Sequence, residues 1–456
     1  MDMVSKLPMT LASSKYGHMV WSILQESLKA VEPGEAVRRA MRLEGSTLHV
    51  GERTYNLQDF DRIFVVGGGK AGAPMAAAIE QILGDRVTAG LVNVKYGHLL
   101  PPAEMPRRIS IREAGHPSPD ENGCEGVRGM FELLTALTER DLVICVISGG
   151  GSALMVLPQP GISLEDMREL TGLLLRCGAT INEMNTVRKH LDAFKGGQLA
   201  RRAMPAQVIS LILSDVVGNP LDVIASGPTA PDTSTFAEAV RVLRDGGIWD
   251  EVAPSIRRRL EAGLAGDVPE NPKADDPIFQ KVNNVIVGSN ELAALAAIEQ
   301  AKALGFNAQL LSTYIEGEAR EVARVFAGLA KELVRYNRPL SRPACLVAGG
   351  ETTVHIQGDG KGGRNQELAL ASAIALEGWS DAMVVSLATD GTDGPTDAAG
   401  ALATGDTVQK GREKGLDARE YLARNDSYHF FEAIGDLLLT GPTNTNVNDL
   451  IFVFAF

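Results

Sequence analysis

The stretch Ile-Phe-Val-Val-Gly-Gly-Gly-Lys-Ala-Gly, residues 63–72, decides the fold class. Four apolar residues in a row predict a strand buried on both faces, and the glycines after them predict a tight turn. A helix is expected next, because Pro74 stands where its first turn would be, and a missing N–H costs little there. A buried strand, a glycine turn and a helix together indicate a unit built on parallel strands.

The same order recurs along the chain. Apolar runs at residues 142–147, 208–213, 284–287, 345–348 and 383–388 each lead into a turn rich in glycine or polar residues. Continuous apolar strands separated by helices predict parallel sheets covered on both faces. The fold class is therefore α/β.

The chain has 456 residues, of which 48 are glycine, and this length favours two or three domains. Composition changes at residues 262–281, where Pro269, Pro272 and Pro277 stand among scattered charges. We predict a Rossmann-like N-terminal domain over residues 1–270, with a parallel sheet flanked by helices. A smaller C-terminal α/β domain with a mixed sheet is predicted over residues 275–456. Pairing of its last strand with the sheet of the first domain is left open.

Charge and composition exclude several classes of protein. Acidic residues number 57 and basic residues 44, for a net charge of −13, so a nucleic acid partner is not expected. No apolar run predicts a membrane span, and the N-terminus lacks the apolar stretch of a secretory signal. The four cysteines form no Cys-x-x-Cys pair, which disfavours a zinc site or a disulfide framework. We expect a cytoplasmic protein, and a homo-oligomer is left open.

Gly67, Gly68 and Gly69 with Lys70 form the first candidate site. Residues 67–72 match the G-x-G-x-x-G pattern of dinucleotide-binding proteins, which also needs an acidic residue about 20 positions later. The next strand ends in Val-Lys-Tyr-Gly instead, so NAD is disfavoured and NADP stays a weaker alternative. The pattern favours a phosphate or carboxylate held by backbone N–H groups and the Lys70 cation. A simple tight turn would explain the glycines but not the lysine.

A second glycine loop, Ser148-Gly149-Gly150-Gly151-Ser152, follows another strand and offers N–H groups and hydroxyls to an anion. It does not match G-x-S-x-G, so no nucleophile elbow is predicted. No G-x-x-x-x-G-K-[ST] pattern exists, which excludes a P-loop nucleotide site.

Further polar residues stand at predicted strand ends or helix starts. Arg364 follows two glycines and suits a phosphate, although Asn365 there is equally typical of a helix cap. Asp390 and Asp393 lie in a glycine-rich loop that could hold Mg²⁺ or supply a base, and a solvated turn is the alternative. Asp215 is a further candidate for the base. Three more residues are candidates for ligand binding: Asn290, Glu351 and Lys195. His116, in Gly115-His116-Pro117, could be catalytic, although a single histidine in a proline-rich turn is more often structural.

Several motifs together resemble a known family, the two-domain bacterial and archaeal glycerate 2-kinases, whose second domain is called MOFRL and whose members are widely labelled hydroxypyruvate reductase. The resemblance runs from about Val65 to the C-terminus. It is carried by Val-Val-Gly-Gly-Gly-Lys-Ala-Gly (65–72), Ala-Gly-His-Pro-Ser-Pro-Asp (114–120), Ser-Gly-Gly-Gly-Ser-Ala-Leu (148–154), Asn-Thr-Val-Arg-Lys-His-Leu (185–191), the run 213–229, Gly-Gly-Glu-Thr-Thr-Val (349–354), Gly-Gly-Arg-Asn-Gln-Glu (362–367) and Thr-Asp-Gly-Thr-Asp-Gly-Pro-Thr-Asp-Ala-Ala-Gly (389–400).

The resemblance implies an ATP- and Mg²⁺-dependent kinase that phosphorylates the 2-hydroxyl of D-glycerate in a cleft between two domains. The family's lysine and arginine match Lys70 and Arg364, which are expected to neutralise the transferring phosphoryl group. Mg²⁺ is expected on Asp390 or Asp393, and the base is expected among these two and Asp215. Asp192 is a departure, because many relatives have serine there, and it leaves substrate selectivity open.

Two other functions stay open at this point. The first is an NAD(P)H-dependent hydroxypyruvate reductase, suggested by residues 67–72 and by the family's common label. The second is a non-catalytic module that binds an anion.

Overall fold

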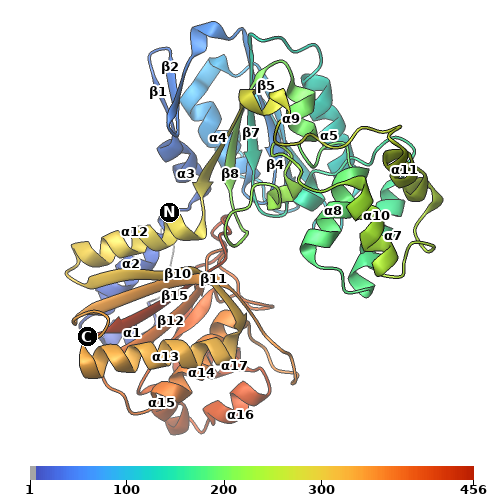
Figure 1. The fold of residues 1–456 in the computed structure, drawn as a ribbon. Helices are drawn as coiled ribbons and strands as arrows, with labels where there is room; N and C mark the ends of the chain where they lie inside the picture. The colour runs from blue at the N-terminus through green and yellow to red at the C-terminus, as the bar shows by residue number, and fades with distance from the viewer. Residues whose placement is uncertain (1–6) are drawn as a thin grey trace. The chain divides into compact units, whose positions relative to one another are not determined.

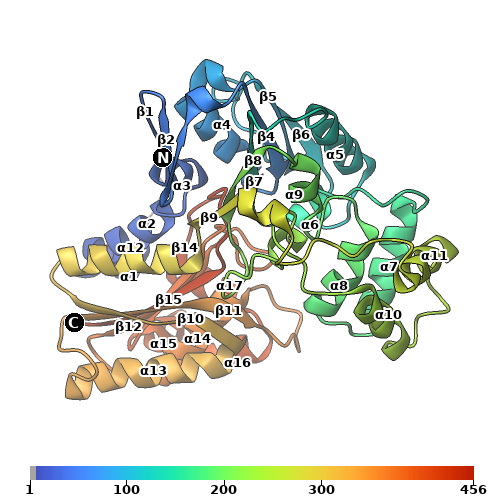
Figure 2. The same ribbon diagram turned by 45° about the horizontal axis from the view of Figure 1, so that its top comes forward.

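A computed structural model describes residues 7–456 of the chain. They divide into two compact units (Figures 1 and 2). One unit is Pro33–Val287, and the other combines the described residues up to Glu32 with Gly288–Phe456. The predicted α/β class with two sheets is confirmed.

The Pro33–Val287 unit is built on a six-stranded sheet in the order β6-β5-β4-β7-β8-β9. The strands β6 to β8 in this order pair in parallel. Their bounds are Ile109–Ala114 for β6, Ala89–Lys95 for β5, Arg62–Gly68 for β4, Asp141–Ile147 for β7, Gln207–Leu213 for β8 and Val282–Gly288 for β9. Every residue of β7 is buried, as a strand in the middle of a covered parallel sheet should be.

Helices cover both faces of this sheet. On one face α5 and α9 bury Met130 and Leu199 against Phe64 and Val143 of the strands, while α4 lies on the opposite face (Figure 1). A small antiparallel sheet, β1-β2-β3, precedes the main one. The bounds are α3 Pro33–Ala40, β1 Met41–Glu44, β2 Thr47–Val50, β3 Arg53–Asn56, α4 Gly72–Leu83, α5 Glu121–Leu133, α6 Gly151–Leu154 and α9 Gln198–Ala203.

Four helices at one side of the same unit have a hydrophobic core of their own. Leu170, Leu174, Val187, Phe236 and Leu243 belong to it and are buried. Ser163, Thr180 and Thr235 cap three of the four helices through reciprocal hydrogen bonds with an acidic residue three positions on. The bounds are α7 Leu164–Arg176, α8 Ile181–Leu191, α10 Phe236–Asp245 and α11 Pro254–Ala265.

The other unit has a mixed six-stranded sheet in the order β10-β11-β15-β12-β13-β14. Only β10 and β11 pair in parallel among the strands of this sheet, all of which lie within the described residues. Helices α12 and α2 cover one face, and α13 and α14 cover the other. The strands are β10 Asn307–Glu318, β11 Ala344–Thr353, β12 Ala382–Ala388, β13 Gly400–Thr404, β14 Leu437–Leu438 and β15 Asp449–Ala455. The helices are α1 Met9–Ser13, α2 Gly17–Lys29, α12 Asn290–Ala303, α13 Ala319–Tyr336, α14 Arg364–Leu376, α15 Thr407–Glu413, α16 Ala418–Ala423 and α17 Ser427–Ile434.

The units divide the chain differently from the boundary expected at residues 270–275. The N-terminal α2 packs on α12, where Gln300 Nε2 donates to Ser22 Oγ at 2.9 Å, so it joins the C-terminal unit. Residues up to Val287 stay with the first unit because β9 pairs beside β8. The last strand, β15, lies between β11 and β12 and does not return to the first sheet.

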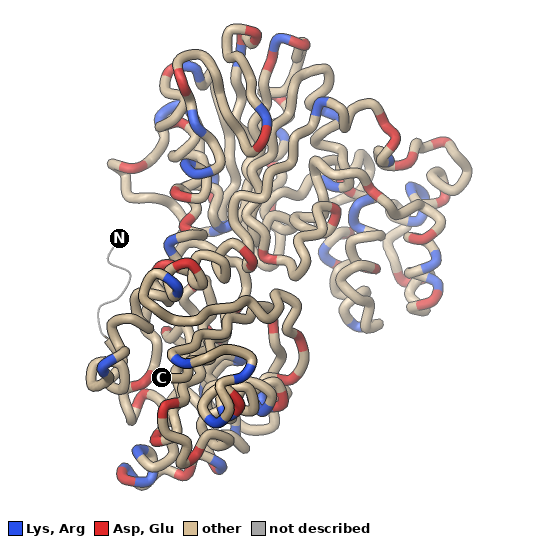
Figure 3. Tube along the Cα trace, turned by 60° about the vertical axis from the view of Figure 1, so that its left-hand side comes forward, with Lys and Arg blue, Asp and Glu red and all other residues tan. Residues whose placement is uncertain are grey.

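Charged residues of both signs are interspersed along the trace of each unit (Figure 3). None of the helices in the described part of the chain is long and apolar enough to span a membrane.

Candidate active site

The strand order places two glycine loops beside each other in the Pro33–Val287 unit. The chain runs from β4 outward through β5 to β6, then returns to β7 on the other side of β4. In such sheets ligands bind where the direction reverses, outside the carboxyl ends of the strands. Here that point lies between residues 67–70 after β4 and residues 148–152 after β7.

Hydrogen bonds join the two loops. Lys70 N–H donates to Gly149 O at 2.8 Å, and Ala71 N–H donates to Ser148 Oγ at 3.1 Å. Ser148 N–H donates in turn to Gly68 O at 3.1 Å. The backbone that carries the Lys70 side chain is therefore held in place by the second loop.

Gly149 and Gly150 bring three side chains together. A Cβ on Gly150, which has φ +81°, would lie 3.0 Å from His116 Cδ2 and 3.4 Å from Lys70 Cγ. A Cβ on Gly149 would lie 2.4 Å from Asp215 Oδ2. Only glycine leaves this space open, so the loop lets Lys70, His116 and Asp215 converge from three different strand ends. Lys70 and Asp215 were predicted as site residues, whereas His116 was left between a catalytic and a structural role, with the structural role favoured.

Few N–H groups of the glycine loops remain available to a ligand. Gly67 and Gly68 belong to β4, and Gly69 N–H donates to Asn93 O at 3.0 Å. The hydroxyl of Ser148 is also engaged, and Ser152 Oγ lies 2.8 Å from Ser226 Oγ. Within residues 7–456 no acceptor is found for the N–H groups of Gly149 and Gly150. The same holds for the N–H of Ser152, so these three groups are the loop's donors available to an anion.

The surroundings of His116 keep its imidazole neutral. Burial, followed by the charges of Lys70 and Lys95 and by His98, lowers the pKa of His116 to about 4. His98 itself lies against the same loop, with Nδ1 3.1 Å from Lys70 O. At neutral pH this corner therefore carries the positive charge of Lys70 beside an uncharged ring.

Lys195 lies elsewhere, in the interior of the unit. Its Nζ donates to Asp192 Oδ2 at 2.7 Å and to Met155 O at 2.9 Å, and the residue is 2% exposed. Burial lowers the pKa of Lys195, and Asp192 opposes that effect. Because its charge is already paired inside the protein, Lys195 is not placed to bind a ligand in this arrangement.

In the C-terminal unit, Arg364 is held by two carboxylates. Its Nε and Nη2 donate to Asp449 Oδ2 and Oδ1 at 2.5 and 3.0 Å, and Nη1 donates to Glu351 Oε1 at 2.8 Å. Burial lowers the pKa of Arg364, but the hydrogen-bonded Asp449 outweighs it and the net shift is upward. For Asp449 burial has the larger effect and raises its pKa to about 6, although Arg364 opposes this shift. Of the two carboxylates, Glu351 is the exposed one, with 45% of its side chain accessible against 5% for Asp449.

The aspartates of the β12 loop have different surroundings. Asp393 is 2% exposed and accepts from the N–H groups of Asn365 and Gln366, at 3.1 and 2.8 Å, at the start of α14. Burial raises its pKa, although these donors oppose the shift. Asp390 is less buried and accepts from Thr392 N–H at 3.0 Å. Asp393 therefore serves as a helix cap, and Asp390 is the aspartate of this pair that can reach a ligand.

Asn290, a candidate from the sequence, binds a polar loop that lies beside the β12 loop. The sequence analysis did not single out that polar loop. Asn290 Nδ2 donates to Val447 O at 2.9 Å and to Asp449 O at 2.8 Å, so it holds the loop before β15. That loop, residues 440–448, is tied to the β12 loop by Thr389 N–H donating to Asn448 O at 3.1 Å. The run Gly-Pro-Thr-Asn-Thr-Asn (441–446) before the last strand was the available signal for a strand-end loop.

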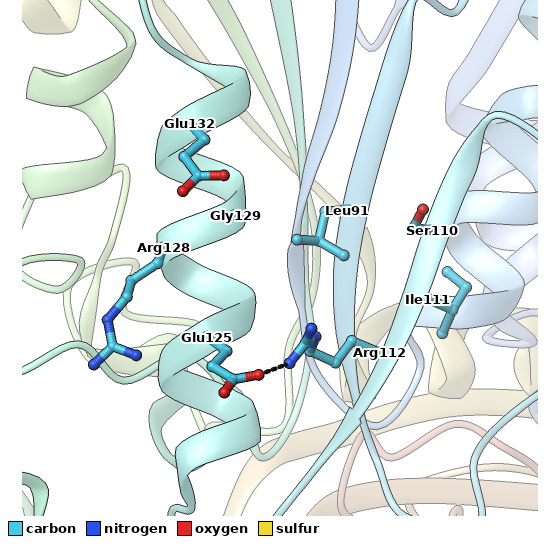
Figure 4. Close-up of a pocket in the computed structure, with 8 residues that line it drawn as sticks. All are labelled: Leu91, Ser110, Ile111, Arg112, Glu125, Arg128, Gly129 and Glu132. Atoms are coloured by element: carbon cyan, nitrogen blue, oxygen red, sulfur yellow. Dashed lines mark hydrogen bonds and ion pairs between the residues drawn. The ribbon is translucent and has the colours of Figure 1, made fainter.

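A surface cavity of about 610 Å³ in the Pro33–Val287 unit lies between β5 and β6 on one side and α5 on the other (Figure 4). Arg112 reaches across it to Glu125, with Nη1 2.5 Å from Oε2. Arg128, on the same helix, pairs with Glu121 at 2.6 Å. Because both arginines already have acidic partners, the cavity offers a phosphate no unpaired arginine.

Both units of the chain are similar to proteins of known family. Residues 19–261 match the model of a domain of unknown function, DUF4147, and residues 344–449 match the MOFRL family. The chain is 44% identical over 429 residues to a D-glycerate 2-kinase of Thermotoga maritima, a match that covers 94% of this chain and 96% of the relative. A crystal structure of a glycerate kinase from the same organism superimposes with a TM-score of 0.87 at 43% identity, covering 96% of this chain and 99% of that chain. A relative from Agrobacterium vitis, 44% identical over 85% of this chain and 86% of its own length, has a provisional hydroxypyruvate reductase name.

Proposed function

The chain belongs to the family of two-domain glycerate kinases, and from that premise we propose that it transfers the γ-phosphoryl group of ATP to the 2-hydroxyl of D-glycerate. The observation that carries the proposal is the convergence of Lys70, Asp215 and two unused glycine N–H groups at the point where the parallel sheet reverses. A cation and paired N–H donors suit a phosphate or carboxylate. Phosphoryl transfer depends mainly on such positioning and charge neutralisation.

Each group receives a role in this proposal. Lys70 and the N–H groups of Gly149 and Gly150 bind anionic oxygens, and Lys70 neutralises charge that develops on the transferring group. Asp215, beside Gly149, is the proposed acceptor of the proton of the glycerate hydroxyl, because Asp393 is committed to capping α14. The hydroxyl oxygen forms a bond to the γ-phosphorus while the bond to the β–γ bridging oxygen breaks, which leaves ADP.

Arg364 has a supporting part in the second unit. Asp449 fixes two of its nitrogens from the buried side, and the exposed Glu351 holds the third. We propose that a phosphate oxygen replaces Glu351 on Nη1 while Asp449 keeps the guanidinium in place. An arginine that is already oriented loses less side-chain entropy when it binds such an oxygen.

Mg²⁺ fits these residues as an ion held mostly by the nucleotide. The described residues include no group of three or more histidine, cysteine or acidic side chains arranged for a metal. Mg²⁺ is commonly held by one or two carboxylates together with substrate phosphates and water, so Asp390 alone satisfies the protein's share. When bound, the ion would neutralise phosphate charge.

We predict that Asp390→Asn raises the Mg²⁺ concentration needed for half-maximal rate by about tenfold or more, because an amide is a weaker ligand than a carboxylate. The measurement is the initial rate at fixed ATP and glycerate over a series of Mg²⁺ concentrations. Asp406→Asn is the control, since Asp406 is exposed and makes no side-chain capping bond. An unchanged Mg²⁺ requirement in Asp390→Asn would remove this residue from the metal site.

The proposed activity is tested by ADP release with D-glycerate and by identification of the product. We expect ADP release that depends on D-glycerate, with 2-phosphoglycerate as the product by ³¹P NMR. A 3-phosphoglycerate product would move the attacked position to the other end of the substrate. Oxidation of NAD(P)H by hydroxypyruvate without ADP release would replace the kinase with the reductase alternative. Cytoplasmic location and a homo-oligomer stay predictions, which cell fractionation and light scattering would test.

A further inference from the structure

His116 has a ring without a hydrogen-bond partner in a corner where polar groups gather. It follows β6 in the turn after Gly115 and is about half-buried. Neither ring nitrogen makes a hydrogen bond to any residue in the range 7–456 that the structure describes. The Cδ2–Nε2 edge faces Gly150, since a Cβ there would lie 3.0 and 3.1 Å from those two atoms. Neither ring nitrogen is among the fully buried polar atoms without a partner, so a ligand oxygen can reach the ring from solvent.

The groups around the ring define what that ligand can be. Lys70 packs against the same glycine from the loop after β4. Lys95 is the last residue of β5, and His98 lies in the turn after it. The acidic groups nearby are Asp215, against Gly149, and Asp120, against Gly115. The cations and the burial oppose a second positive charge on the ring. A neutral imidazole still has one N–H to donate, and the N–H of Gly150 beside it is also unused.

We propose that His116 is a substrate-binding residue, whose Nε2–H donates a hydrogen bond to an anionic oxygen that Lys70 also binds. The proposal rests on the proposed kinase function and names a further group of the same site. The oxygen belongs to a carboxylate or a phosphate, so its source is D-glycerate or the nucleotide. A neutral donor strengthens the site without the repulsion that a second cation beside Lys70 would bring.

The first experiment observes the ring directly. The protein is labelled with ¹⁵N-histidine, and the ring signals of its seven histidines are recorded with D-glycerate alone, ADP alone and inorganic phosphate alone. The His116 signal is assigned by its loss in His116→Gln. We expect it to shift with at least one ligand, and its pKa to rise when the anion is bound. The ligand that shifts the His116 signal, D-glycerate or ADP, is the source of the oxygen. A ligand that is bound by calorimetry but leaves the His116 signal unchanged in every arm overturns the proposal.

The second experiment separates hydrogen bonding from packing. His116→Leu fills the space but removes the donor, and we expect KM for the ligand identified above to rise about tenfold, as the loss of a bond to a charged group would produce. His116→Gln keeps an N–H donor and should recover most of that loss. His49→Leu, on the small β1–β3 sheet, is the control for replacing a histidine. Equal KM values in both variants, whether raised or normal, overturn the donor role.

The two experiments distinguish this proposal from the proposed function. If the wild-type protein releases no ADP with D-glycerate, the kinase proposal fails. The ring signal in the phosphate and ADP arms still decides whether His116 contacts an anion. If ADP is released normally but the ring signal and KM do not respond, the kinase proposal stands and the inference about His116 fails.

Discussion

Lys70→Ala is expected to lower kcat by about 10²- to 10³-fold, because the loss of one group that stabilises transition-state charge has effects of this size. Lys70 is only partly buried, and no carboxylate among the described residues forms an ion pair with it. Its charge is therefore available to a ligand, in contrast to the charges of Arg364 and Lys195, which are paired within the protein. The measurement is kcat at saturating ATP and D-glycerate.

The control for Lys70→Ala removes a cation from the opposite edge of the same sheet. Arg140 stands just before β7, and its partner Asp61 just before β4, and both side chains are more than half exposed. Arg140→Ala should leave kcat unchanged. Near-normal kcat in a folded Lys70→Ala protein, with a melting temperature like that of the wild type, would contradict the charge-stabilising role.

The proximity of the candidate site residues at the carboxyl edge of the first unit's sheet was largely predictable from sequence. The apolar runs that became β4, β7 and β8 each end in a polar or glycine-rich turn. Because parallel strands bring their carboxyl ends to one edge, Lys70, Gly149 and Asp215 had to lie near one another. The pattern could not show which N–H groups stay unused, since the N–H of Gly69 donates to Asn93 O on the neighbouring strand β5, about 24 residues further along the chain.

Residues whose role depends on distant partners were not predictable. A structural role for His116 was favoured over a catalytic one because a single histidine in a proline turn has no periodic signal, and only the approach of Gly150 reveals its position. Asp390 and Asp393 have the same residue type three positions apart, yet only Asp393 meets the first N–H groups of α14. The N-terminal helix α2 joined the C-terminal unit because its apolar face packs on α12, a contact that no local pattern indicates.

Asp192 is the position at which the resemblance to the family left substrate selectivity open. The resemblance implied serine at this position, so the aspartate raised a question of substrate selectivity. In the structure Asp192 is fully buried and accepts from Lys195 Nζ at 2.7 Å and from the N–H groups of Phe194 and Leu157 at 2.8 and 3.2 Å. The aspartate therefore organises the interior, and it carries the charge that balances Lys195.

Asp192→Ala is expected to reduce the free energy of unfolding by about 3–5 kcal/mol, because it leaves a buried ammonium without a counter-charge. Urea unfolding followed by circular dichroism measures the loss. Lys195→Met is the second substitution to test. The double variant Asp192→Ala/Lys195→Met should be more stable than Asp192→Ala alone, because it also removes the unpaired charge. Asp61→Ala breaks an exposed pair of the same kind and should change stability little.

The same variants separate stability from selectivity. If Asp192 acts only on the interior, Asp192→Ala assayed well below its melting temperature should keep the wild-type KM for D-glycerate, and the added Lys195→Met change should restore stability without altering KM. A changed KM with an unchanged free energy of unfolding would mean that Asp192 acts on the substrate site and that its bond to Lys195 contributes little. Because Asp192 follows α8 directly and binds the backbone at Leu157 and Phe194, a loss of both stability and affinity would point to movement of α8. The double variant decides that case, since restored packing should then recover both quantities together.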